Sequence, residues 1–188
     1  QPITNLRTGR IVHVEALTRF VATPNRSPDQ WFAEAHRVGL GLQLELAAVS
    51  NAAALLDHLP DDVGLCINVG PVALRSAGLL DLIPEQHRHR VVLEITEHEA
   101  LDPLAIAGPL DIIRNGGVRI AIDDTGSGYS SLNNLLRIKP DIIKLDRELV
   151  RGIDHDPVRR AMARALVHLA REDSVATIVA EGIETEAE

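Results

Sequence analysis

The stretch RIAIDDTGSG, Arg119–Gly128, places two adjacent carboxylates, Asp123 and Asp124, at the end of an apolar run and follows them with a glycine-rich turn. Two like charges in contact repel each other, and the repulsion grows where water is scarce. Two explanations fit the stretch by itself. Either the pair is solvated and caps the next helix, or a cation lies between the two carboxylates.

Composition limits the fold and the partners. Apolar residues make up 45% of the 188 residues but aromatic residues only 2%, so a single domain with an aliphatic core is expected. The formal net charge of −8 argues against a nucleic-acid polymer or an anionic membrane as a partner, because both need a basic footprint. One cysteine, Cys66, allows no internal disulfide, and no apolar run is long enough for a membrane span. We therefore expect a cytoplasmic protein or the cytoplasmic part of a membrane-attached parent.

Apolar runs typical of strands alternate with amphipathic segments typical of helices. The predicted strands are 1–3, 11–17, 64–69, 91–96, 118–124, 141–146 and 177–182, and the predicted helical segments are 42–59, 103–117 and 158–173. A turn at LRTGR joins the first two strands, which we expect to be antiparallel. The alternation predicts a parallel sheet with both faces covered. At this level it fits a doubly wound sheet and a barrel equally well.

Polar side chains at the strand ends favour the barrel. Six of the seven predicted strands end in such residues, namely Glu15, Asn68, Glu94, Asp123 with Asp124, Lys144 with Asp146, and Glu181. A doubly wound sheet gathers its ligand at two or three strand ends, whereas a barrel brings the C-terminal ends of all its strands to one rim. We therefore predict an α/β fold, a (β/α)8 TIM-like barrel with an antiparallel first strand and without its last strand.

Five carboxylates on one rim, with Asp146 as a candidate sixth, would repel one another strongly beside a single lysine. Oxygen ligands of this kind suit Mg²⁺ or Mn²⁺, so the pattern predicts a metal site. Each residue also has a structural explanation. Glu15 or Glu181 could be a charge at a helix start, Asn68 a turn residue, and Lys144 with Asp146 a salt bridge.

Six motifs in this order resemble the EAL domain, the family of bacterial cyclic di-GMP phosphodiesterases. They are EALTR at Glu15–Arg19, INVGP around Asn68, LEITE with Glu94 and Glu97, DDTGSGYSSL from Asp123, KPDIIKLD with Lys144, and AEGIET with Glu181 and Glu184. The resemblance covers the whole chain. It implies one domain, 1–188, shortened at its C-terminal end and belonging to a longer multidomain signalling protein.

The resemblance also implies roles for single residues. Glu15, Asn68, Glu94 and Asp123 would hold one Mg²⁺ or Mn²⁺ ion, and Asp123, Asp124 and Glu181 would hold a second. Lys144 would be the catalytic lysine, acting with Glu15 and Asp123, and two nearby cations would lower its pKa. Arg19 would contact a substrate phosphate, Glu184 and Asp146 would be further substrate contacts at the rim, and Glu97 would steady the loop after Asp124.

The implied function is metal-dependent hydrolysis of cyclic di-GMP to the linear dinucleotide. Two alternatives stay open: a silent cyclic di-GMP receptor or protein-interaction module of the same fold, and a barrel that acts on another phosphoester. A regulatory or sensor domain of the parent protein is an expected partner, and a second copy of the chain is a candidate partner that the sequence does not decide. Thr125 departs from the family, which usually has Phe there, so we expect the segment Thr125–Ser131 to be more mobile than the strand before it.

Overall fold

The computed structural model describes residues 1–96, 103–125, 131–172 and 176–188. The strands are β1 (Pro2–Thr4), β2 (Ile11–Ala16), β3 (Gly64–Asn68), β4 (Val91–Thr96), β5 (Arg119–Thr125), β6 (Ile142–Leu145) and β7 (Thr177–Ala180). The helices are α1 (Pro28–Arg37), α2 (Gly41–Ala53), α3 (Pro71–Leu74), α4 (Pro103–Asn115), α5 (Ser131–Ile138), α6 (Arg147–Val150) and α7 (Pro157–Glu172). All seven predicted strands are therefore confirmed, each to within two residues at both ends.

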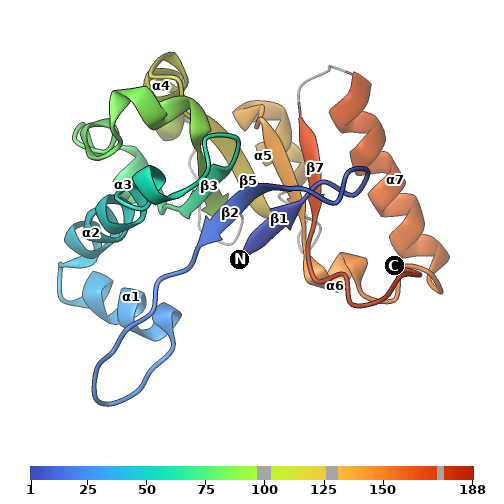
Figure 1. The fold of residues 1–188 in the computed structure, drawn as a ribbon, viewed down its shortest axis with the longest axis horizontal. Coiled ribbons are helices and arrows are strands. Elements are labelled where there is room, and N and C mark those ends of the chain that lie inside the picture. The colour runs from blue at the N-terminus through green and yellow to red at the C-terminus, as the bar shows by residue number, and fades with distance from the viewer. Residues whose placement is uncertain (97–102, 126–130, 173–175) are drawn as a thin grey trace.

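The strands form one sheet in which the spatial order is the chain order, β1 to β7. β1 is antiparallel to β2, and every later pair is parallel. The sheet curls into a nearly closed barrel with helices on its outer side (Figure 1). Within the described residues β1 and β7 are the two edges of the sheet. The predicted α/β barrel with an antiparallel first strand is confirmed.

Strand alternation separates two apolar layers. Leu65 and Ile67 of β3 belong to the large core between the barrel and the helices, whereas Cys66 between them points into the barrel. The inner cluster is small and consists of Cys66, Val92, Ala121 and Ile142, with Ile3 and Val179 packed against it. Two residues further along β3 to β6, the same inward face carries Asn68, Glu94, Asp123 and Lys144. The barrel interior is therefore apolar at mid-height and charged at its C-terminal rim.

The helices agree less closely with the sequence analysis. The helix expected over 42–59 ends at Ala53, and a separate 3₁₀ turn follows at Leu56–His58. The structure also adds the short helices α3, α5 and α6, which the apolar pattern did not single out. The longest helix, α7, has 16 residues. None of the helices in the described ranges combines the length and the apolar character needed to cross a membrane.

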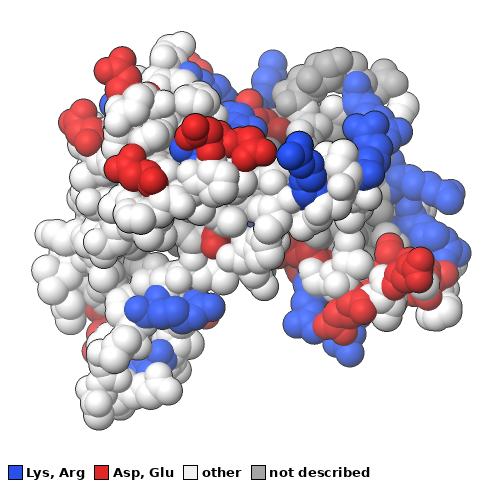
Figure 2. All heavy atoms as spheres, viewed as in Figure 1, with Lys and Arg blue, Asp and Glu red and all other residues white. Residues whose placement is uncertain are grey.

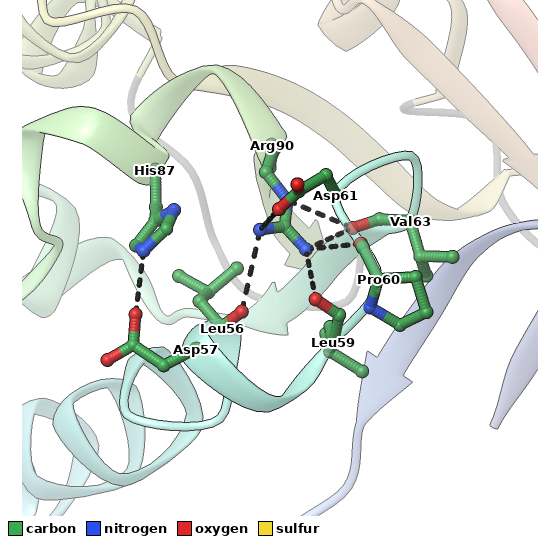
Figure 3. A network of polar contacts seen from close by, with 8 residues as sticks. All are labelled: Leu56, Asp57, Leu59, Pro60, Asp61, Val63, His87 and Arg90. Carbon is green, nitrogen blue, oxygen red and sulfur yellow. Dashed lines mark hydrogen bonds and ion pairs between the residues drawn. The ribbon is translucent and has the colours of Figure 1, made fainter.

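Arg90, directly before β4, binds the chain that leads into β3. Its guanidinium is 6% exposed and lies 3.8 Å from Asp61 Oδ1. It donates to backbone carbonyl oxygens, which belong to Leu56, Leu59, Pro60 and Val63 (Figure 3). His87 lies beside it, with Nε2 2.8 Å from Asp57 Oδ1. One buried cation thus fixes the N-terminal ends of two neighbouring strands.

Basic side chains gather over α7, although the chain as a whole is acidic (Figure 2). This helix contains Arg159, Arg160, Arg164 and Arg171. Arg159 donates to the carbonyl of Arg151 at 2.6 Å, and Arg160 donates to the carbonyl of Ile153 at 3.1 Å. Part of this basic surface therefore holds the connection between α6 and α7.

Candidate metal centre

Lys144 lies at the centre of the charged rim. It is 1% exposed, and its Nζ is surrounded by four carboxylates from different parts of the barrel. Nζ lies 2.7 Å from Glu181 Oε1, 3.0 Å from Glu94 Oε2, 3.1 Å from Asp123 Oδ2 and 3.8 Å from Glu15 Oε1. These acids come from β2, β4 and β5 and from the residue after β7. One ammonium group therefore faces an excess of negative charge.

The protein groups shift one another's pKa values. Burial raises the pKa of Glu94 to about 7, with Glu15 and Asp123 acting in the same direction and Lys144 opposing them. Burial also raises the pKa of Glu181. Burial alone would lower the pKa of Lys144, but the carboxylates of Glu94 and Asp123 outweigh it and raise the pKa above its ordinary value. The lowered pKa expected for Lys144 thus requires bound cations, because the protein groups alone act in the opposite direction.

The adjacent aspartates reach the same rim because β5 is irregular at its end. In a regular strand Asp123 and Asp124 would point to opposite faces. The pairing of β5 with β6 shifts register between Ile122 and Thr125, and Asp124 has a φ of 56° in the left-handed region. The Asp124 amide donates to Asp123 Oδ1 at 2.9 Å. This bulge turns both carboxylates toward one site, a common use of bulges near functional residues.

The rim carboxylates form two groups that share Asp123. One contains Glu15, Glu94 and Asp123, and the other contains Asp123, Asp124 and Glu181. Within each group one ligand oxygen from every residue lies within 4.8 Å of the others. Asn68 adjoins the first group, because its Nδ2 donates to Glu15 Oε1 at 3.1 Å. The structure therefore brings together Lys144 and all six residues that were predicted to hold metal.

The residues present fit hard divalent cations. Every donor is an oxygen, as Mg²⁺ and Mn²⁺ prefer. Glu94 Oε1 is buried and has no hydrogen-bond partner in the described part of the chain, which is costly for a carboxylate oxygen unless a cation binds it. Five carboxylates and one ammonium group carry four net negative charges when ionised, and two divalent cations would balance that charge.

The other predicted contacts lie apart from this cluster. Arg19 is exposed and donates to the carbonyl of Thr18 at 2.9 Å. Glu184 is exposed and pairs with Arg147 at 2.6 Å. β6 ends at Leu145, so Asp146 is outside the strand and caps α6 by accepting from the Glu148 amide at 2.9 Å. Their roles in substrate binding stay predictions.

Two of the expected features involve residues outside the described ranges. Glu97, which was expected to steady the loop after Asp124, lies outside the described residues. Residues 126–130, which make up most of the segment Thr125–Ser131, also lie outside them. Thr125 itself is fully buried at the end of β5. Its Oγ1 has no hydrogen-bond partner among the described residues.

Arg147 supports the rim, and the sequence analysis did not single it out. Its side chain pairs with Glu184 and packs so closely on Gly182 that a Cβ there would collide with Arg147 Cγ. Gly182 has a φ of 69° and directly follows Glu181. The motif KLDR placed an arginine after the rim residues of β6, but nothing in the sequence showed that it reaches the end of β7.

Known proteins are similar to this chain over nearly its whole length. The family model for the EAL domain matches residues 1–188. The probable cyclic di-GMP phosphodiesterase PdeB of Escherichia coli is 31% identical over 98% of this chain and 37% of its own length. The bifunctional diguanylate cyclase/cyclic di-GMP phosphodiesterase MucR of Pseudomonas aeruginosa is 33% identical over 100% of this chain and 29% of its own length. The chain thus spans well under half of these multidomain relatives.

A solved structure is similar over the whole chain. The manganese and cyclic di-GMP complex of BlrP1 from Klebsiella pneumoniae at pH 6 has a TM-score of 0.85 and 33% identity, over 100% of this chain and 49% of that one. The family model and the similar solved structure therefore support the family that the six motifs indicated. This chain belongs to the EAL domain family.

Proposed function

We propose that this chain is a metal-dependent phosphodiesterase that hydrolyses cyclic di-GMP to linear pGpG. The proposal is carried by one observation: two acidic groups share Asp123, and Lys144 lies next to this shared residue. The names of PdeB and MucR support the substrate, and the manganese and cyclic di-GMP complex of BlrP1 supports both the substrate and the metal.

In this proposal Glu15, Asn68, Glu94 and Asp123 hold one cation, and Asp123, Asp124 and Glu181 hold the other. Two cations held in this way would lower the pKa of a bound water and would supply positive charge to the attacking and leaving oxygens on phosphorus. Mg²⁺ and Mn²⁺ are both suited to these oxygen ligands.

Lys144 has a separate role. Its ammonium group has three N–H donors and lies within 3.8 Å of carboxylates from both groups. Cations bound to these carboxylates would lower the pKa of Lys144. The ammonium form would orient the nucleophilic water, and the neutral amine, formed by loss of a proton to solvent, would accept the proton of that water. Arg19 has an exposed planar guanidinium on the chain that follows β2, and it contacts a phosphate of the substrate.

The test is incubation of the chain with cyclic di-GMP and either Mg²⁺ or Mn²⁺, followed by chromatography of the products. We expect linear pGpG with metal and none after addition of a chelator. Tight binding of cyclic di-GMP without any product would contradict the enzymatic proposal and identify a silent receptor. Hydrolysis of other phosphodiesters at the same rate as cyclic di-GMP would contradict the proposed substrate.

A further inference from the structure

Glu45 of α2 is a buried carboxylate outside the rim that the mechanism above does not use. It is 7% exposed. Its Oε2 accepts from the Gly70 amide at 3.0 Å, and its Oε1 lies 2.9 Å from His36 Nε2 at the end of α1. Both oxygens are therefore engaged, one by the backbone after β3 and the other by a neighbouring helix. Burying a carboxylate is costly unless partners compensate for the lost water, and the Gly70 amide and His36 are such partners.

The Gly70 amide belongs to the turn that follows Asn68, the last residue of β3. On the other side of this turn, the Val69 amide donates to the carbonyl of Glu94 at 3.0 Å. Asn68 in turn donates to Glu15 Oε1 at 3.1 Å. The turn is thus held between α2 and β4, and its position decides where the Asn68 side chain lies relative to Glu15.

A residue larger than glycine at position 70 would push the Glu45 carboxylate out of its present position. A Cβ at Gly70 would lie 2.8 Å from Glu45 Oε2 and 3.0 Å from Oε1. The backbone there has a φ of −83° and a ψ of 167°, which any residue can adopt. A side chain at position 70 would therefore leave the backbone unstrained but would displace the Glu45 carboxylate. The His36 ring is packed similarly on Gly41, so the carboxylate is also confined from the side of α1.

We propose that Glu45 is a positioning residue for the metal centre. Its carboxylate, steadied by His36, fixes the turn at Gly70 and so holds Asn68 and Glu15 where they can ligate the first cation. This inference rests on the proposed function, because it assigns Glu45 to the same metal site. Groups that orient metal ligands in this way are commonly worth 10- to 100-fold in metal affinity or activity.

The first test measures Mn²⁺ binding without nucleotide, by calorimetry, in Glu45→Ala. We expect affinity to fall by about 10- to 100-fold, exchange of the Gly70 amide with solvent to accelerate, and kcat to return toward the parent value at saturating Mn²⁺. Glu34→Ala is the matched control, because Glu34 of α1 pairs with Arg37 at the protein surface. It should bind Mn²⁺ as the parent does.

Gly70→Ala tests the same contact from the other side and decides the matter if Glu45→Ala does not fold. The added Cβ should displace the carboxylate and weaken Mn²⁺ binding to a similar extent, and the double variant should bind no more weakly than Glu45→Ala. Parent-like Mn²⁺ affinity in either folded variant would overturn the inference while leaving the proposed function intact. A parent that binds no Mn²⁺ would instead contradict the proposed function, and this inference with it.

Discussion

Two buried cations lie at opposite ends of the barrel and have very different surroundings. Arg90, at the N-terminal end of β4, is 6% exposed and donates mainly to backbone carbonyl oxygens (Figure 3). Lys144, near the C-terminal end of β6, is 1% exposed and faces four carboxylates. Arg90 is stabilised by neutral carbonyl groups of the loop before β3, and these groups would have no hydrogen-bond donor from this side chain without it. Lys144 lies in a site with surplus negative charge.

The difference separates stability from function. The carbonyl groups around Arg90 are already hydrogen-bonded and need no further ligand, so this end of the barrel contributes to the stability of the fold. The negative charge of the carboxylates around Lys144 exceeds the charge that one ammonium group can neutralise. Such surplus charge is typical of catalytic and metal-binding sites. This agrees with the general division of barrels into a stabilising N-terminal end and a functional C-terminal end.

The largest effect is expected from Asp123→Asn, which removes the charge shared by both acidic groups. We expect turnover of cyclic di-GMP to fall by about 10³-fold or more, because a single electrostatic group alone is worth about 10²–10³. Asp141→Asn is the control, since Asp141 accepts from the Ile120 amide at the other end of β5. Turnover of Asp123→Asn within tenfold of the parent would contradict the assignment of two cations.

Lys144→Met should reduce turnover by about 10²–10⁴, the usual range of general acid–base assistance, with a much smaller change in affinity for cyclic di-GMP. Lys139→Met serves as the comparison, because Lys139 is an exposed lysine ahead of β6, and this variant should keep most of the activity. Rate measurements combined with equilibrium binding separate the two effects. If Lys144→Met hydrolyses substrate at the parent rate, the lysine is structural, as Arg90 is.

Arg90→Met should have the opposite profile. It leaves several buried carbonyl groups without a donor, and we expect a loss of about 3 kcal/mol in the free energy of unfolding. Mn²⁺ affinity of the folded protein should stay at the parent value, because the guanidinium lies at the other end of β4. Urea denaturation and calorimetric titration measure the two quantities. A variant with normal stability and impaired metal binding would reverse the comparison.

Glu94 provides a test by pH. Its pKa of about 7 in the folded protein lies above the ordinary value of 4.5, so the folded state binds this proton more tightly than the unfolded chain. Its contribution to stability is therefore lost as pH rises through about 7. In the presence of a chelator we expect the parent to lose about 1 kcal/mol between about pH 6 and about pH 8 relative to Glu94→Gln. Denaturation curves that show the parent gaining stability over this interval would contradict the shift.

The smallest effect concerns Thr125, whose buried hydroxyl has no partner among the described residues. Thr125→Val keeps the shape and removes the polar atom, so it should stabilise the fold by at most about 1 kcal/mol without changing turnover. Thermal unfolding measures the change, with Thr177→Val as the control, because Thr177 is exposed at the start of β7. A destabilised Thr125→Val would mean that the hydroxyl has a partner in the residues that follow.

Much of the architecture follows from local pattern. The strands were predictable because alternating and continuous apolar runs such as RIAI and DIIK depend on burial alone, and their polar ends marked the rim. The short helices α3 and α6 were not predictable, since four residues are too few to show a period. The break after Ala53 in the expected long helix was also hidden, because the sequence on both sides of it is apolar.

The sequence by itself determined the rim residues and their chemistry, because it shows which residues end each strand. The polar ends of six strands also indicated a barrel, in which the strands follow one another in chain order. Only the tertiary structure decided how those residues face one another. The bulge that aligns Asp123 with Asp124 depends on the register against β6, and the capping role of Asp146 depends on where that strand stops. The contact from Glu45 to Gly70 joins residues 25 positions apart. Such contacts are set by the packing of whole elements, and no local pattern in the chain records them.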